Sequence, residues 1–184
     1  MKRMRFPRLV LLLAALAVSV SAPPVVAASR SELERDSVRA LKSLYAGNSA
    51  ARLLGTKARA ILVFPNIVKA GFMFGGQIGE GVLLTNGRPA GYYSSVAASY
   101  GFQAGVQVFG YALFFMNNEA LAYLDKSDGW EIGVGPSIVV VDAGVGKSLT
   151  STTITQDVYA FIFDQKGLMG GIGVQGSKIT KISK

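Results

Sequence analysis

Three carboxylates near the middle of the chain are the first residues whose spacing could do chemistry. Asp125, Asp128 and Glu131 lie in the run Asp-Lys-Ser-Asp-Gly-Trp-Glu, and closely spaced carboxylates are typical of calcium loops. Such a loop requires Gly at its sixth position, whereas Gly129 is the fifth residue counted from Asp125. We therefore interpret this segment as a polar turn and predict no metal site.

A second candidate is the run Gly144-Val145-Gly146-Lys147-Ser148, which ends like a phosphate-binding P-loop. That motif places Gly five positions before the Gly of the Gly-Lys pair, where this chain has Val141. The glycines of 76–81 also lack the Gly-x-Gly-x-x-Gly order, and no parallel strand-helix-strand unit surrounds them. We therefore predict no nucleotide and no cofactor.

The 184 residues include no His and no Cys. Imidazole and thiolate zinc sites, Ser-His-Asp triads, Cys nucleophiles and disulfides are therefore excluded. Four other carboxylates could act as an acid and base, but they are isolated in the sequence: Glu80, Asp142, Asp157 and Asp164. We predict a protein that is not an enzyme, with no catalytic residues; two carboxylates in one closed pocket would argue for a hydrolase.

Residues 1–28 have the pattern of an export signal. A basic start (Lys2, Arg3, Arg5 and Arg8) precedes the apolar run 9–20, which is shorter than the ~20 residues of a transmembrane helix. Small residues follow, and we expect cleavage after Ala27 or Ala28; the alternative is an uncleaved N-terminal anchor. We therefore predict export to the periplasm or cell envelope, with peripheral membrane association left open, and one mature domain over 29–184.

Export changes the meaning of the formal net charge of +8, because four of the 19 basic residues lie in the signal. Residues 29–60 carry seven basic and three acidic groups, residues 61–177 carry five and eight, and three lysines follow. Nucleic acid is therefore not an expected partner. The positive charge lies at the two ends of the mature chain.

Two helices are expected at the start of the mature domain. Ser31 and Glu34 have capping-box spacing, and an apolar residue recurs with a roughly helical period until Gly47 (Leu33, Val38, Leu41, Leu44 and Tyr45). A second helix over 49–60 would turn Leu53 and Leu54 inward and its cations outward. A solvated helix face and a ligand site both account for those cations.

From Ile61 onward, short apolar runs alternate with glycine and predict strands. We expect strands at 61–64, 71–84, 91–95, 101–109, 111–116, 131–134, 137–141, 158–164 and 168–175. Asn86-Gly87-Arg88-Pro89 predicts a turn, and Asn117 or Asn118 predicts the cap of a short helix through Leu124. Glycine clusters at 71–76, 101–105 and 167–171 favour sharp bends. The predicted fold class is α+β, with a strongly curved antiparallel sheet or a small closed barrel.

Several segments, in a fixed order, resemble the SYLF domain family. They are Ala60 to Phe72, Gly75-Gly76, Gly79 to Leu83, Gly101 to Gly105, Met116-Asn117, Glu119-Ala120-Leu121, Gly135-Pro136, Lys166-Gly167-Leu168 and Gly171. The resemblance spans residues 35–179. Eukaryotic members bind phosphoinositides and membranes, fungal members bundle actin, and bacterial relatives are exported proteins regarded as lipid-binding.

The resemblance implies that an amphipathic N-terminal helix and a basic surface contact the membrane. By position it assigns lipid binding to Arg35, Arg39, Lys42, Arg52, Lys57, Arg59 and Lys69. The expected partner is anionic phospholipid or a membrane surface. Two other interpretations remain open: an envelope structural or assembly protein without a lipid ligand, and a small outer-membrane β-barrel. The oligomeric state is not predicted.

Overall fold

A computed structural model describes residues 28–126, 130–131, 136–141 and 154–184. In chain order the elements are α1 (Arg30–Gly47), α2 (Ser49–Gly55), β1 (Ala60–Thr85), β2 (Arg88–Phe115), α3 (Asn118–Lys126), β3 (Trp130–Glu131), β4 (Ile138–Val140) and β5 (Val158–Ile182). The prediction of an α+β fold around a strongly curved sheet is confirmed. Residues 1–27, Asp128, Asp142 and the Gly144 to Ser148 run lie outside the described residues.

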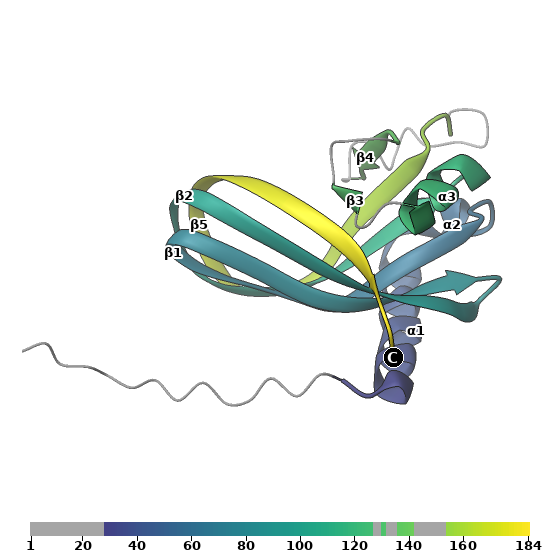
Figure 1. The fold of residues 1–184 in the computed structure, drawn as a ribbon, viewed down its shortest axis with the longest axis horizontal. Helices are drawn as coiled ribbons and strands as arrows, with labels where there is room; N and C mark the ends of the chain where they lie inside the picture. Colours follow the sequence, from purple (N-terminus) through teal and green to yellow (C-terminus); the bar gives the residue numbers. More distant parts are fainter. Residues whose placement is uncertain (1–27, 127–129, 132–135, 142–153) are drawn as a thin grey trace, which may run out of the picture.

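Three long strands form most of the sheet. β1, β2 and β5 pair antiparallel along their whole lengths, β3 extends the order β1-β2-β5-β3, and β4 pairs parallel with β5. Figure 1 shows the three strands running away from the helices, curling over at one end and returning. Among the described strands this hydrogen-bonded path is open, so the sheet is curved rather than closed.

The separate short strands expected from the sequence are parts of these continuous strands. Pro65 and Asn66, expected to end a strand, lie in an irregularity between Phe64 and Ile67 of β1. Proline cannot donate a ladder hydrogen bond, but a bulge on an edge strand tolerates it. A further irregularity separates Phe72 from Phe74, and it allows the strand to bend without ending.

The two halves of β1 lie against one another through glycines. A Cβ added at Gly79 would lie 2.8 Å from Cγ1 of Ile67, and one at Gly81 would lie 2.6 Å from Cδ1 of Phe64. No larger residue fits these positions unless its neighbours move. Glycine in this strand therefore permits a close approach of backbone to side chain.

Alternation along the strands produces two apolar cores. Leu62, Phe64 and Leu113 face the inside of the curl, and α3 contributes Ala120 and Leu124 to this inner core. The intervening residues form an outer core against α1 and α2, with Leu33, Leu44, Leu54, Val63 and Phe114 among its members. Helices and strands thus lie in layers on both faces of one sheet at the end shown on the right of Figure 1.

The short sequence motifs predicted some turns and helix ends correctly and others wrongly. The turn at Asn86-Gly87 is present with φ of 52° and 73°, and Asn117 caps α3 by accepting the Ala120 N–H at 2.8 Å. Two expectations were wrong. Ser29 caps α1 instead of Ser31, because its side chain and that of Glu32 form the capping box, and α2 ends at Gly55 instead of Ala60. α2 stops early because Arg59 N–H already bonds to Phe115 O, which begins the pairing of β1.

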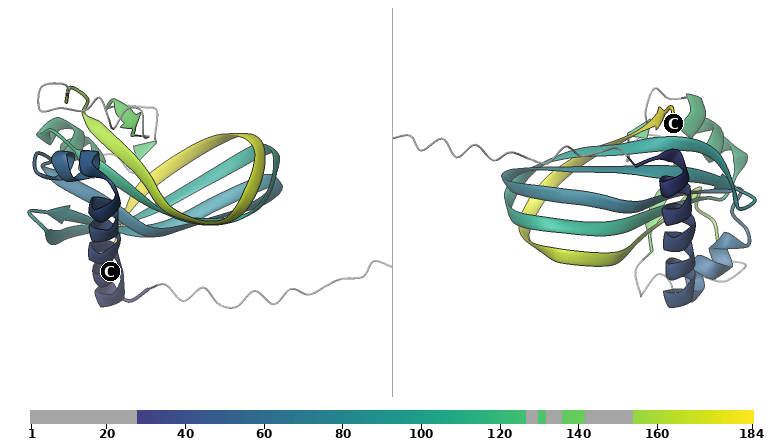
Figure 2. Two further views of the ribbon diagram at one scale, coloured as in Figure 1. Left: turned by 180° about the vertical axis from the view of Figure 1, so that it is seen from behind. Right: turned by 90° about the horizontal axis from the view of Figure 1, so that it is seen from below.

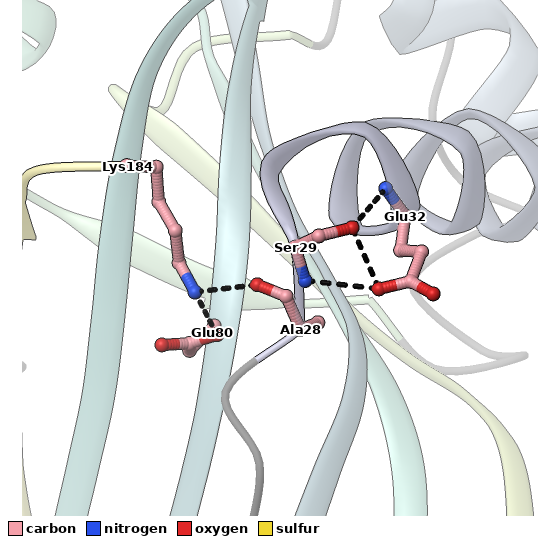
Figure 3. Close-up of polar contacts among 5 residues, drawn as sticks. All are labelled: Ala28, Ser29, Glu32, Glu80 and Lys184. Atoms are coloured by element: carbon pink, nitrogen blue, oxygen red, sulfur yellow. Dashed lines mark hydrogen bonds and ion pairs between the residues drawn. The ribbon is translucent and has the colours of Figure 1, made fainter.

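The ends of the described domain meet beside α1. Lys184 Nζ donates to the carbonyl of Ala28 at 2.8 Å and to Glu80 Oε2 at 2.7 Å (Figure 3). None of the helices in the described part of the chain is long and apolar enough to cross a membrane.

Candidate functional site

Three of the predicted lipid-binding residues lie in one stripe on α1. Arg35, Arg39 and Lys42 are spaced i, i+4, i+7, which places them on one helix face, and all three are exposed. Leu33 and Leu44 lie on the opposite face and are buried against the sheet. The stripe is therefore the solvent face of a helix whose other face is fixed.

The packed face of α1 is held to the sheet by polar contacts as well. The Ser37 hydroxyl donates to Val63 O at 3.4 Å, and Tyr92 OH donates to the Glu34 carboxylate. Arg30 Nε lies 3.1 Å from Glu34 Oε1, and the guanidinium lies 5.3 Å from the centroid of the Tyr92 ring. The hydrogen bonds from Tyr92 and then Arg30 lower the pKa of Glu34.

The acidic residues of α1 are all engaged. Glu32 accepts from the Ser29 side chain and backbone, which lowers the pKa of Glu32, and Asp36 forms an ion pair with Arg39 at 3.2 Å. With Glu34 bonded to Arg30 and Tyr92, no described acid forms an ion pair with Arg35 or Lys42, although Arg35 attracts the Glu32 carboxylate at longer range. These two cations carry the excess charge of the stripe.

The other four predicted residues are more dispersed. Arg52 lies on α2, Lys57 and Arg59 lie in the connection to β1, and all three are exposed. Lys69 is half-buried on β1, beyond the Pro65 irregularity and opposite Gln107 of β2. The structure thus brings six candidates to the helical region and separates Lys69 from them; lipid binding by all seven stays a prediction.

The amphipathic helix implied by the family resemblance has its apolar face covered. Leu33, Ser37 and Leu44, which form that face, are each at most 4% exposed. Packed as it is, α1 offers a membrane a mainly charged side, on which Val38 is the one large apolar residue that is exposed among the described residues of α1. Any apolar insertion must come from another part of the molecule.

A groove of about 450 Å³ lies between α1 and β1. Its apolar lining includes Leu33, Val68 and Ile78, and two carboxylates, Asp36 and Glu80, also line it. Both acids are already in ion pairs, Asp36 with Arg39 and Glu80 with Lys184. The groove is therefore not built to receive an anionic headgroup.

The remaining described carboxylates of interest have structural partners. Asp125 accepts from Tyr93 OH at 2.9 Å and from Lys181 Nζ at 3.0 Å, and Asp164 accepts from Ser43 Oγ at 2.9 Å. Burial, and then the bond to Asp125, raises the pKa of Tyr93. Within the described ranges, no cluster of three acidic side chains could hold a metal ion.

Asp157 joins three elements at the end of the sheet opposite the curl. Its carboxylate accepts from Asn117 Nδ2 at 2.7 Å, from Ser137 N at 3.0 Å and from Ser137 Oγ at 2.9 Å. These hydrogen bonds, from the Ser137 backbone first, lower the pKa of Asp157. The network fixes the start of α3, the segment leading into β4 and the start of β5.

The sequence reasoning missed the exposed apolar residues of the curl, among them Phe72, Phe74 and Leu168. Their apolar character favoured a buried core, which is the usual position of such residues in a strand. One signal could have pointed to them: no Asp or Glu occurs in 66–79, 96–109 or 165–178, the three segments that form the curl.

Helices packed on a single curled antiparallel sheet define an α+β domain with a charged helical surface. Residues 96–184 match the model of the Ysc84 family, described as Las17-binding protein actin regulator. This match runs from β2 to the end of the chain, and it confirms the resemblance to the SYLF domain family over that part of the sequence. A search of the curated proteins found no match.

Proposed function

We propose that this protein binds anionic phospholipid at a membrane surface, without catalysis, as an exported protein of the periplasm or cell envelope. The observation that carries the proposal is the cationic stripe of α1, which faces solvent while the opposite face of the helix is buried. Each cation near an anionic surface contributes about 1 kcal/mol. Several cations on one side of the helical region could therefore hold the domain at a membrane.

The match of residues 96–184 to the Ysc84 family model supports a binding function rather than catalysis. The matched model is described as Las17-binding protein actin regulator. The family resemblance adds membrane binding, and since an exported protein would not meet actin, membrane binding is the family property that we transfer to this chain. Fractionation of cells that express the full chain and a chain lacking 2–27 tests the export part of this proposal.

Co-sedimentation with vesicles tests the lipid part. The mature chain should bind vesicles that contain phosphatidylglycerol or cardiolipin, bind neutral phosphatidylcholine vesicles more weakly, and be released as salt rises. Reversing two cations of the stripe, Arg35→Glu with Lys42→Glu, should weaken binding by more than about tenfold.

A matched variant controls for total charge. Arg88→Glu with Lys126→Glu changes the net charge equally at exposed residues outside α1 and α2, and it should leave binding nearly unchanged. Equal losses in the two variants would mean that net charge, not the stripe, governs binding. A mature chain that binds neither anionic nor neutral vesicles would contradict the proposal and favour an assembly protein without a lipid ligand.

A further inference from the structure

The end of the sheet farthest from the helices exposes large apolar side chains. Figures 1 and 2 show the three long strands curling over at this end, with α1, α2 and α3 at the other. Phe72 is 76% exposed, Phe74 is 69% exposed and Leu168 is 88% exposed. We call the curled segments 66–79, 96–109 and 165–178 the tip; at its base, Val68 and Ile78 of β1 border the groove against α1. An apolar surface of this kind at a protruding end marks an interaction site.

The exposed apolar residues belong to neighbouring strands. Val106 of β2 pairs with Ala70 of β1 on one side and with Leu168 of β5 on the other, which places the three side chains on one face. Phe72 lies two residues beyond Ala70 and therefore on the same face, opposite to that of buried Ile67. The apolar residues thus form a continuous patch across the sheet.

The backbone at the bend directs this surface outward. Met73 adopts φ of 60°, a left-handed conformation that side chains other than glycine rarely take, and it separates the two exposed phenylalanines. A Cβ at Gly71 would lie 2.5 Å from the Cα of Gly75, so the chain reverses tightly here. The result is a convex apolar projection and not a groove.

The charge of the tip favours one kind of binding partner. None of its three segments contains an acidic residue, whereas segment 66–79 contains Lys69 and segment 165–178 contains Lys166 and Lys178. Lys166 and Lys178 are exposed; Lys166 forms no ion pair with a described residue, and Lys178 lies opposite Glu131 of β3 in the strand pairing. An apolar projection flanked by cations complements a bilayer whose headgroups are anionic, and a fluid bilayer can accept a convex shape.

We propose that the tip inserts its apolar residues, Phe72, Phe74 and Leu168 foremost, into the interface of an anionic phospholipid bilayer, with Lys166 and Lys178 at headgroup level. This inference rests on the proposed function and names a second contact surface for it. It also supplies the apolar contact that α1, with its apolar face buried, does not offer.

Two measurements test insertion separately from binding. The chain has no Cys, so Phe74→Cys can be labelled at one position with an environment-sensitive fluorophore; Glu119→Cys on α3, at the opposite end, is the matched control. With vesicles of phosphatidylcholine and phosphatidylglycerol in equal parts, the label at 74 should shift to the blue and be quenched by lipid-borne quenchers. The label at 119 should do neither.

Apolar-to-polar variants give the second measurement. Phe72→Ser with Phe74→Ser should weaken vesicle binding by at least about tenfold, since each buried aromatic contributes about a factor of ten or more. Val140→Ser with Ile162→Ser removes two exposed apolar residues outside the tip and should change binding less than about twofold. Circular dichroism verifies that both variants fold.

The outcomes are distinct. Wild-type binding with a label at 74 that stays in water, and with no loss in the double serine variant, would overturn tip insertion and leave the proposed function standing. No wild-type binding to any vesicle would overturn both. Loss of self-association in the serine variant, measured by sedimentation, with unchanged vesicle binding would overturn insertion by identifying the tip as a contact between copies.

Discussion

The two ends of the curled sheet differ in where they place apolar and charged side chains. At the helical end, Leu33, Leu44 and Leu54 are buried and the cations of α1 face solvent. At the tip, Phe72 and Leu168 face solvent, and the three curled segments contain no acidic residue. The helical end thus combines a buried apolar core, which stabilises the fold, with a charged surface. At the tip, large apolar side chains are exposed and contribute little to stability.

This difference suggests that the two ends contribute to membrane binding in different ways. Charge acts at a distance of about 10 Å in moderate salt and would attract the domain to an anionic surface. Apolar contact acts only on insertion, and it is not screened by salt. If both proposals hold, the helical end governs the salt dependence of binding and the tip governs the binding that persists at high salt.

The largest expected effect concerns stability at the helical end. Leu54→Ala should lower the free energy of unfolding by about 2–5 kcal/mol, because Leu54 is fully buried and its loss leaves a cavity. Phe74→Ala at the tip should change it by about 1 kcal/mol or less, because the side chain is 69% exposed. Denaturant unfolding of the two variants measures both values. A similar loss in each would mean that the tip is packed in solution.

The next effect tests the close approach that holds the two halves of β1 together. Gly81→Ala should cost about 1–3 kcal/mol, because the new methyl would lie 2.6 Å from the Phe64 ring and from Val63 O. Gly76→Ala, within the tip, is the control, since its Cβ would meet only Ala97 O at 3.7 Å. Thermal melts that rank the two variants equally would contradict the role given to Gly81.

Local features of the fold could be predicted where the signal is local. Asn86-Gly87 forms its turn because both residues tolerate positive φ, and Asn117 caps α3 through its own side chain. The strands could not be delimited at Pro65, because whether a proline ends a strand or sits in a bulge depends on pairing with β2. Strand pairing is a tertiary property. Because of it, several of the short strands predicted from the sequence are parts of one long, bent strand in the structure.

The candidate site, like the fold, was predictable from the sequence only where the signal is local. Exposure of Arg35, Arg39 and Lys42 followed from helical period, but the separation of Lys69 from them depends on where β1 bends. Phe72 and Leu168 have the composition of core residues, and only the curl of the sheet leaves them uncovered. Sequence pattern therefore predicted the charged surface and not the apolar one.

A smaller effect is expected at Asp157, far from the tip. Its lowered pKa means that the folded state binds a proton less readily than the unfolded state, whose carboxyl has a pKa of about 4. The stability it contributes is therefore present above that pKa and is lost as pH falls through the lower, folded-state value. Asp157→Asn should cost about 1 kcal/mol at neutral pH, since the carboxylate is partly exposed to solvent.

The pH dependence of unfolding is the control for the Asp157→Asn variant. Unfolding of wild type and Asp157→Asn should differ at pH 7 and converge in acid, while Asp164→Asn, whose carboxylate accepts one hydrogen bond from Ser43, should differ less from wild type. A difference between wild type and Asp157→Asn that persists unchanged in acid would indicate a packing effect rather than a charge effect.

The smallest effect separates two serines at the start of α1, the helix that presents the cationic stripe. Ser29→Ala should cost about 0.5–1 kcal/mol, because it removes the side chain that accepts the Glu32 N–H and completes the capping box. Ser31→Ala should be neutral or slightly stabilising, since Ser31 lies inside the helix, where alanine is the better former. Helical circular dichroism and thermal unfolding of the two variants compare them directly. A larger loss for Ser31→Ala would move the start of α1 to the position that sequence spacing first suggested.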